Sequence, residues 1–165
     1  MAYIIPDDIS RLALAGASEP ELETLAFLKD HLPGDYVVFH GVHWSRAYEA
    51  RTAFGEIDFV IVNRAGDAML IEQKNGPMEE TDDGLVKSYA GGGFKAPADQ
   101  ARRAVDQVKG KFRDVHGQGA NLRLDYLVYC PDHRIRNLNA AGLDMDRVVD
   151  AAHRDGLAER IEGIL

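Results

Sequence analysis

The chain has 165 residues, a length that suits one domain, and it is 45% hydrophobic and 28% charged, as is usual for a folded protein. Its formal net charge of −8 argues against a protein that coats nucleic acid through charge alone, although it leaves room for an enzyme with a local basic surface. The sequence has neither an apolar run long enough to cross a membrane nor the basic-then-apolar start of a secretory signal. The single cysteine, Cys130, cannot form a disulfide within the chain, which favours a cytoplasmic protein.

The N-terminal segment, residues 1–17, is expected to be a short leader containing one or two helical turns. A helix is expected over residues 18–32, where leucines recur with helical spacing. Ser18 can cap this helix, Pro20 is tolerated in its first turn, and Glu21 takes the capping-box position.

Three strands follow, which we expect at residues 36–40, 54–62 and 67–73. Trp44 either closes the first strand or begins a loop that runs to Thr52. The tight turn at residues 63–66 predicts that the second and third strands form an antiparallel hairpin. His40 and His43 are three residues apart, which places them on different faces of a strand, so we expect core or surface histidines rather than a metal pair.

Residues 74–96 lack periodicity and are rich in glycine, which predicts a flexible loop. This loop is either a flap whose aromatic residues stack on bases or a variable insertion. A helix is expected over residues 97–114, a fourth strand over 122–130, and one or two helices between 144 and 164. The order of helix, three strands, helix and strand predicts an α/β fold.

Charged residues on the predicted hairpin can form an acidic cluster. Alternate side chains share a face of a strand, so Glu72 and Lys74 point to one side and Gln73 to the other, while Glu56 and Asp58 likewise share a face. Across the hairpin Asp58 can approach Glu72, and two close carboxylates in a partly buried sheet repel each other unless a divalent cation such as Mg²⁺ lies between them. Lys74 could then orient a water, assist its deprotonation or stabilise charge on a phosphate. The spacing alone also allows a plain surface ion pair between Glu72 and Lys74, with Asp58 solvated.

Four blocks of sequence occur together in an order that is more specific than any one of them. They are Leu32–Val42, Gly55–Asp58, Ile71–Asn75 and Pro97–Ala101. Together they resemble the nuclease-related domain, called NERD, which is a branch of the PD-(D/E)XK nuclease superfamily. The resemblance covers roughly residues 18–130. It implies a restriction-endonuclease-like αβββαβ core, with a central mixed sheet flanked by helices, and a Mg²⁺-dependent DNA nuclease that could also use Mn²⁺.

The resemblance also implies a role for each matching residue. Asp58 and Glu72 would be metal ligands, Lys74 the catalytic lysine, the Gln73 backbone carbonyl a further ligand, and Gln100 the helix glutamine of the site. Gln73 departs from the apolar residue that the family often has there, but it faces away from the site.

The family tends to complete its site with a glutamate from the first helix. By its distance from Leu32–Pro33 the best match is Glu21, followed by Glu23 and Glu19, and a simple capping role is the alternative for Glu21. Glu56 either supports the ligands from behind or turns outward.

A basic segment offers a surface for DNA. Residues 84–123 contain eight basic and three acidic side chains, a net charge of +5. Arg103, Gln107 and Lys111 follow Gln100 at helical spacing, and Lys95 precedes the helix, so these four side chains are candidates for contacts with phosphate. A solvated helix face is the alternative.

Residues 18–165 are therefore expected to form one nuclease-related domain, the N-terminal part of a longer protein. The resemblance implies DNA as a partner, a fused or associated helicase or other DNA-processing module, a homodimer, and a context such as DNA repair; no membrane association is expected. The alternative function is a catalytically weak or inactive module of the same fold that binds nucleic acid or a partner protein.

Overall fold

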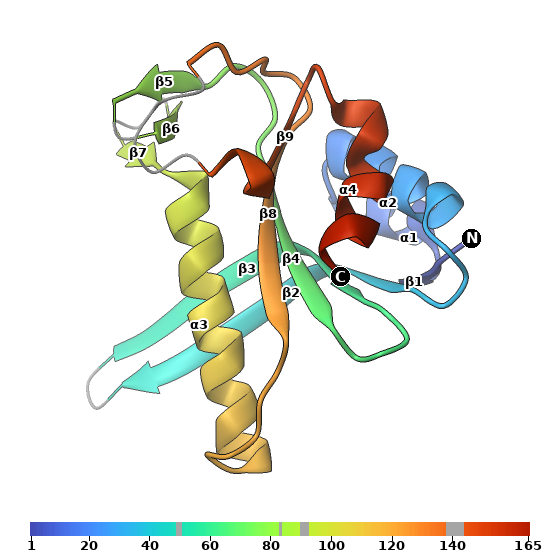
Figure 1. Ribbon diagram of the computed structural model, residues 1–165, viewed down its shortest axis with the longest axis vertical. Helices are drawn as coiled ribbons and strands as arrows, with labels where there is room; N and C mark the ends of the chain where they lie inside the picture. Colours follow the sequence, from blue (N-terminus) through green and yellow to red (C-terminus); the bar gives the residue numbers. More distant parts are fainter. Residues whose placement is uncertain (49–50, 83, 90–92, 138–143) are drawn as a thin grey trace.

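The computed structural model describes residues 1–48, 51–82, 84–89, 93–137 and 144–165. In these residues the chain forms a central six-stranded mixed sheet, a small three-stranded sheet, and helices on both faces of the central sheet (Figure 1). None of the described helices combines the length and the apolar character needed to cross a membrane.

The central sheet has the strand order β1-β2-β3-β4-β8-β9. Its strands are β1 (Tyr3–Ile5), β2 (Val37–Tyr48), β3 (Arg51–Val62), β4 (Ala68–Gln73), β8 (Leu124–Cys130) and β9 (Val148–Asp150). The β2–β3 and β3–β4 pairs are antiparallel, as short turns allow, whereas β1–β2, β4–β8 and β8–β9 are parallel. The parallel β4–β8 pair requires a long crossover, which the helix α3 (Pro97–His116) supplies.

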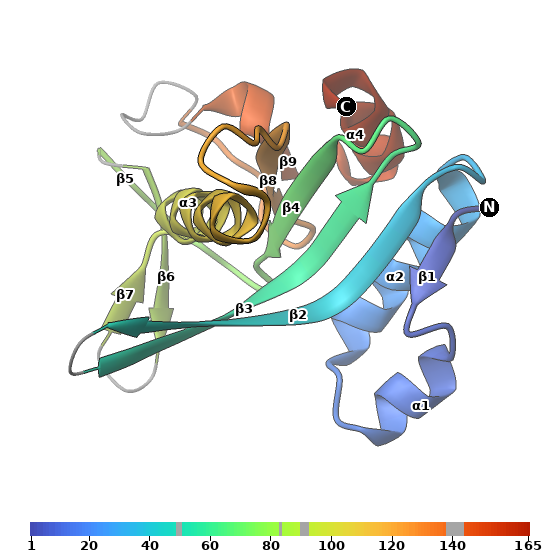
Figure 2. The ribbon, with the colours of Figure 1, turned by 90° about the horizontal axis from the view of Figure 1, so that it is seen from below.

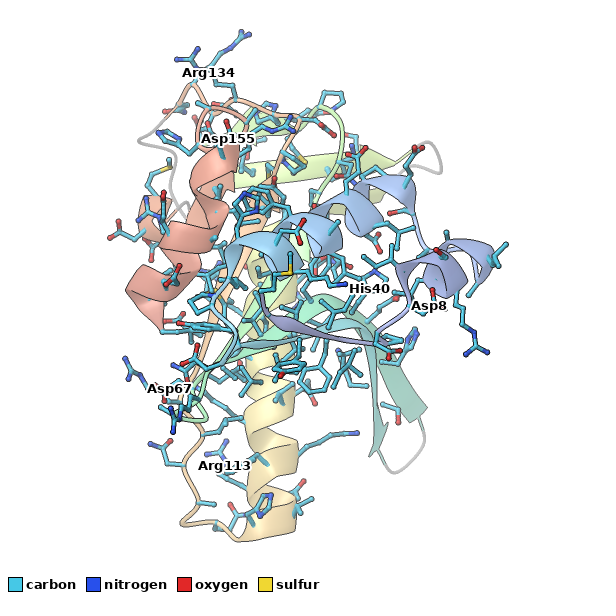
Figure 3. The ribbon with its side chains drawn as sticks, turned by 90° about the vertical axis from the view of Figure 1, so that its right-hand side faces the viewer. Asp8, His40, Asp67, Arg113, Arg134 and Asp155 are labelled. Carbon is cyan, nitrogen blue, oxygen red and sulfur yellow. The ribbon has the colours of Figure 1, made fainter. Side chains whose placement is uncertain are left out.

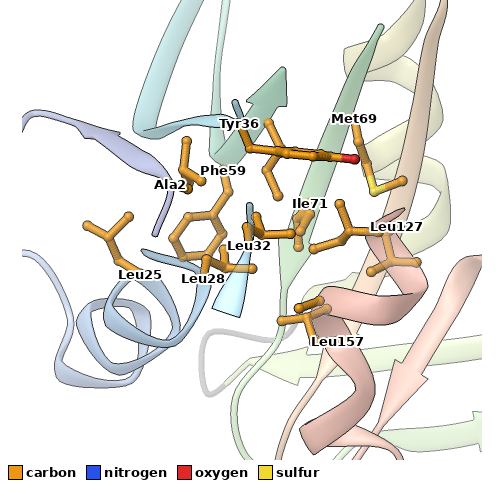
Figure 4. Packing of buried hydrophobic residues seen from close by; sticks show 14 of the residues in the cluster. Ala2, Leu25, Leu28, Leu32, Tyr36, Phe59, Met69, Ile71, Leu127 and Leu157 are labelled. Carbon is orange, nitrogen blue, oxygen red and sulfur yellow. The ribbon is translucent and has the colours of Figure 1, made fainter. Parts of the chain in front are cut away.

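The helices lie in two layers, which Figure 2 shows with α3 end-on. Helices α2 (Glu19–His31) and α4 (Leu157–Ile164) cover one face, and their leucines and isoleucines pack with Phe59 and Ile71 in the main core (Figure 4). Helix α3 covers the other face, where the small residues Ala101 and Ala104 are buried and let the helix approach the sheet closely. The remaining helical elements are α1 (Ile9–Leu14), η1 (Met145–Arg147) and η2 (Arg154–Gly156).

This architecture confirms the expected fold class. Within the described residues, α2, β2, β3, β4, α3 and β8 follow one another in the order expected of the αβββαβ core, although a small sheet is inserted between β4 and α3. The hairpin at residues 63–66 is also as expected: Gly66 has φ +84°, and its N–H donates to the Asn63 carbonyl at 3.0 Å. Helix α3 and strand β8 match their expected ranges to within two residues.

Four segments differ from the expectation. Residues 1–17 are not a separate leader: β1 pairs with β2, and Ala2 and Ile4 are buried in the main core. Trp44 neither closes the first strand nor begins a loop to Thr52, because β2 continues to Tyr48 and β3 starts at Arg51. In the C-terminal region, β9 adds an edge strand where only helix was expected. Strands of three residues are too short to show a periodic pattern, so neither β1 nor β9 could be predicted from periodicity.

The fourth difference is in residues 74–96, which were expected to form a flexible loop. Their described part contains β5 (Glu79–Thr81), β6 (Gly84–Tyr89) and β7 (Gly93–Lys95), which pair as a small antiparallel sheet. Glu80 fastens this sheet to the segment after β8, because its carboxylate accepts hydrogen bonds from His133 Nε2 and from the backbone N–H groups of Arg136 and Asn137.

The β2–β3 hairpin changes its buried face close to Asp58. Phe59 packs in the core under α2, whereas Ile57, two residues earlier, packs with the residues under α3. Strict alternation would place both on one face. The facing strand has Gly41 at this level with φ +62°, a conformation that glycine adopts without strain. The strand therefore rotates between Ile57 and Phe59. As a result Asp58 and Glu56 do not share a face, although strict alternation predicted that they would.

Candidate active site

The charged residues of β3 and β4 meet where the hairpin turns away from the body of the sheet. The register pairs Phe59 with Ile71, so Asp58 and Glu72 are the next residues along the two strands. The backbone N–H of Gln73 donates to Asp58 Oδ2 at 2.7 Å, which fixes the Asp58 carboxyl against the end of β4. Lys74 follows β4 directly, and its Nζ lies 2.5 Å from Glu72 Oε1. The expected placement of Glu72 and Lys74 on one side is therefore found.

Burial gives this cluster unusual electrostatics. The side chains of Lys74 and Glu72 are only 13% and 8% exposed. Burial, with the nearby charge of Glu72, raises the pKa of Asp58 to about 7, although the Gln73 N–H and Lys74 oppose the rise. At neutral pH a large share of Asp58 is thus protonated. A cation bound beside Asp58 would favour its ionised form and displace this proton.

Glu21 joins the cluster from helix α2. Its side chain is 28% exposed, and Oε2 lies 3.1 Å from Nε2 of the buried His40. This hydrogen bond, with contributions from Ser18 and Lys74, lowers the pKa of Glu21, and Glu21 in turn helps to raise the pKa of Asp58. Glu21 therefore does more than cap the helix, since it faces His40 and is close enough to act on Asp58 and Lys74.

The other glutamates considered for the site are exposed, and Glu56 lines the same cavity as Glu21 and His40. Glu19 and Glu23 of α2 are exposed. Glu56 is also exposed, and its Oε1 lies 3.8 Å from Nε2 of the exposed His43. The expectation that Glu56 shares a face with Asp58 is wrong, because the hairpin rotates between the two residues. Glu56 instead turns outward, which was the alternative prediction for this residue.

Gln73 faces the opposite side of β4, as expected from alternation. Its Nε2 donates to the Pro20 carbonyl at 3.2 Å and to Asn75 Oδ1 at 2.9 Å. The first of these bonds ties the end of β4 to the start of α2. Gln73, where the resemblance implies an apolar residue, thus links β4 to α2, and both of these elements carry candidate site residues.

Gln100 lies in the first turn of α3, and its Oε1 is buried without a hydrogen-bond partner among the described residues. Such an acceptor is costly unless a water or ion satisfies it. Within the described ranges this oxygen therefore accepts no hydrogen bond from Lys74. The structure leaves Gln100 with an unused acceptor and does not link that oxygen directly to the acidic cluster.

The donor set of the cluster is suited to a hard divalent cation. Across the described ranges no three His, Cys, Asp or Glu side chains converge into a metal site by themselves. Mg²⁺ does not require such a cage, since it is usually held by one or two carboxylates together with waters and substrate phosphate. Asp58 and Glu72 supply two carboxylates, the Gln73 carbonyl is a third oxygen, and a cation would relieve the repulsion that raises the pKa of Asp58.

The expected DNA-contacting residues lie mainly on α3. Arg103 and Lys111 are exposed there, and Gln107 is partly buried. Lys95 belongs to β7, but its side chain lies outside the described residues. Arg113, which Figure 3 labels near the far end of α3, extends the basic character of this helix.

Sequence reasoning missed His40 as a site residue. It lies beneath α2, on the side of the molecule that carries α1 (Figure 3). Strand alternation puts it on the same face as the fully buried Val38, a signal of burial, but nothing local indicates that a helix glutamate lies above it. Cys130 is buried, and burial raises its pKa to about 12, which keeps it a thiol.

The family model described as nuclease-related domain matches residues 17–131, more than half of the chain. The chain belongs to the nuclease-related domain family. This confirms the resemblance drawn from the four sequence blocks, whose expected extent was residues 18–130. No protein with a curated description matches this nuclease-related domain.

Among solved structures, this domain is similar to one described as the crystal structure of protein VC1899 from Vibrio cholerae. The two are 14% identical with a TM-score of 0.45, and the similarity covers 87% of this chain and 32% of the other. The nuclease-related domain thus spans about a third of the chain that it matches.

Proposed function

We propose that this nuclease-related domain is a divalent-metal-dependent DNA nuclease that hydrolyses phosphodiester bonds. The observation that carries the proposal is the carboxyl group of Asp58, which is buried beside Glu72 and Lys74 and has its pKa raised to about 7. Such an arrangement is unfavourable for stability and is typical of a functional site. Membership of the nuclease-related domain family supports the same interpretation.

Asp58 and Glu72 would hold the cation, with Glu21 and the Gln73 carbonyl as further oxygen ligands. When bound, Mg²⁺ or Mn²⁺ supplies Lewis acidity, which neutralises charge on a phosphate oxygen and makes a bound water more acidic. Lys74, which contacts Glu72, would orient a water or stabilise charge on a phosphate oxygen. Gln100 offers its unsatisfied amide oxygen as an acceptor for a water.

DNA would approach along the basic face of α3, through Arg103, Gln107 and Lys111, with Lys95 at the preceding strand. Because the whole chain carries −8, binding by this domain alone should be weak and sensitive to salt. A fused or associated helicase, or another DNA-processing module, would then supply most of the affinity. We place this activity in the cytoplasm, in a context such as DNA repair, with a homodimer as the form able to cut both strands.

A cleavage assay on end-labelled single-stranded and double-stranded DNA tests the proposal. The protein is expected to cleave with Mg²⁺ or Mn²⁺ and not with EDTA. Asp58→Asn and Lys74→Met should each lower the rate by about a hundredfold or more, as is common when a group acting in the transition state is lost. Glu56→Gln is the matched control, because Glu56 lies on the same strand two residues from Asp58 but is exposed. If the unaltered protein cleaves neither DNA, or if Asp58→Asn cleaves at the full rate, the proposal is wrong.

A second candidate is a module of the same fold that binds DNA or a partner protein and cleaves weakly. The direct contact between Lys74 and Glu72 favours it, since this ion pair occupies one of the carboxylate oxygens that a cation would use. Measurable DNA binding without cleavage in either Mg²⁺ or Mn²⁺ would support this second function over the first.

A further inference from the structure

The contact between His40 and Glu21 joins a strand of the sheet to the helix above it. The His40 side chain is 6% exposed, and its Nε2 lies 3.1 Å from Glu21 Oε2. An ionised carboxylate can only accept a hydrogen bond, so the imidazole donates from Nε2. The ring also lies against Phe59, with centroids 5.4 Å apart and planes inclined by 54°. Because Phe59 is fully buried, the imidazole is held in one orientation by the core itself.

The start of helix α2 is thus fixed in two ways. Gln73 Nε2 donates to the Pro20 carbonyl, which positions the backbone of the first turn. His40 contacts the carboxylate of Glu21, the residue after Pro20, which fixes the direction of its side chain. Without His40 the carboxylate of this glutamate would lose its hydrogen bond to the sheet.

Glu21 is the member of the acidic cluster that comes from outside the β3–β4 hairpin. It lies 37 residues before Asp58 in the sequence, and its side chain lines a cavity together with that of His40. A glutamate side chain loses rotational entropy when it is fixed on a ligand. A partner that fixes it beforehand removes that cost from the binding step, as hydrogen-bond partners of metal ligands commonly do.

We propose that His40 is a positioning residue for metal binding: it holds the Glu21 carboxylate in one direction at the start of α2, so that Glu21 can contribute to cation binding. This inference rests on the proposed function, because it assigns a task to His40 only if the cluster binds a cation. His40 itself does not touch the cation or the substrate in this role.

Mn²⁺ affinity in the absence of DNA, measured by calorimetry or by electron paramagnetic resonance of free Mn²⁺, tests the inference without relying on cleavage. His40→Ala should weaken Mn²⁺ binding by about tenfold or more, the range usual for loss of a partner behind a metal ligand. His40→Gln should recover most of the affinity, because the glutamine amide can donate from a position close to that of Nε2. In a Glu21→Gln background, His40→Ala should cause no further loss.

His43→Ala is the matched control. His43 lies on the same strand and also faces a glutamate, Glu56, but its side chain is 78% exposed and the closest approach is 3.8 Å. It should bind Mn²⁺ like the unaltered protein. Urea unfolding of each variant separates stability from affinity, since a purely structural His40 would lower the unfolding midpoint and leave the Mn²⁺ affinity of the folded protein unchanged.

Three results would overturn the inference alone, while the unaltered protein still binds Mn²⁺ and cleaves DNA. The first is unchanged affinity in folded His40→Ala. The second is a His40→Gln variant as weak as His40→Ala, which would make the imidazole itself a ligand. The third is a full additional loss when His40→Ala is combined with Glu21→Gln. If instead the unaltered protein neither binds Mn²⁺ nor cleaves, the proposed function is wrong and this inference falls with it.

Discussion

The raised pKa of Asp58 means that ionisation of this carboxyl group destabilises the folded, metal-free protein. The carboxyl group is buried near Glu72, and its pKa moves from 3.8 to about 7 in the folded chain. Folding therefore favours the protonated form of Asp58, and the ionised form weakens the fold. The penalty is absent below pH 4, grows as the pH rises from about 4 to about 7, and is complete above that range.

Asp58→Asn should accordingly stabilise the metal-free protein at pH 8. The gain should be on the order of 2–4 kcal/mol, from about 1.4 kcal/mol for each unit of pKa shift with allowance for relaxation of the site. It should shrink toward zero at pH 4, where Asp58 is protonated in both the folded and unfolded states. Urea unfolding in EDTA at the two pH values measures this, and Glu56→Gln should show little change at either pH. Equal stability of the Asp58→Asn variant and the unaltered protein at pH 8 would contradict the raised pKa.

At the scale of elements, one carboxylate makes several of the polar contacts that attach the small β5–β7 sheet, in addition to the apolar packing of Leu85 with Val128 and Ile135. Glu80 is 15% exposed, and it accepts hydrogen bonds from His133 Nε2 at 2.9 Å and from Asn137 N at 2.6 Å. Met78 N donates to His133 Nδ1 at 3.2 Å, so the other ring nitrogen, Nε2, is the one that faces Glu80. The backbone donors from Asn137 and Arg136 lower the pKa of Glu80, with desolvation opposing them, so its contribution is present at neutral pH and is lost on acidification.

Glu80→Ala should loosen the attachment of this small sheet without unfolding the domain. The loss should be about 1.5–3 kcal/mol in local stability, the usual contribution of hydrogen bonds to a charged group. Hydrogen–deuterium exchange should become faster at the amides of Arg136 and Asn137, while the amides of β4 and β8 stay protected. Asp82→Ala is the control, because Asp82 lies in the turn directly after β5 and is exposed. Unchanged exchange at Arg136 and Asn137 would show that other contacts hold the sheet.

Helix α3 offers a second prediction at this scale. Replacing Arg103 and Lys111 together by Ala should weaken DNA binding uniformly across sequences and lower the slope of log affinity against log salt by about 2, roughly one unit for each phosphate that is no longer neutralised. Fluorescence anisotropy at several salt concentrations measures the slope. Arg64→Ala, an exposed basic residue in the β3–β4 turn, is the control and should leave the slope unchanged. A slope that the double variant does not alter would exclude this face of α3 as the phosphate-contacting surface.

At the scale of the whole molecule, the first residues of the chain belong to the core. Ile4 is 5% exposed and packs with the main cluster, whereas Ile5 beside it is 47% exposed. Both lie in β1, which pairs with β2 next to the region that positions His40.

Ile4→Ala should therefore lower the free energy of unfolding by about 2–5 kcal/mol, the usual cost of truncating a buried isoleucine. Ile5→Ala should cost under about 1 kcal/mol because its side chain remains largely in water. Urea unfolding followed by circular dichroism compares the two. If both variants lose the same small amount, residues 1–17 are the dispensable leader that the sequence predicted.

The sequence by itself determined the features that depend on neighbouring residues. Alternation along β4 put Glu72 and Lys74 on one side and Gln73 on the other, and the turn at residues 63–66 brought β3 back to β4 so that Asp58 approaches Glu72. Helical spacing located α2 and α3, which was enough for the αβββαβ core and for the proposed site.

The tertiary structure alone decided the contacts between distant segments. It placed His40 under Glu21, set Gln73 against Pro20, added β1 and β9 to the sheet, and rotated the hairpin at Gly41 so that Glu56 points outward. The physical reason is that periodicity reports only which side of its own element a residue occupies. Which residue from another element lies opposite depends on the path and twist of the whole chain, and no local pattern records it.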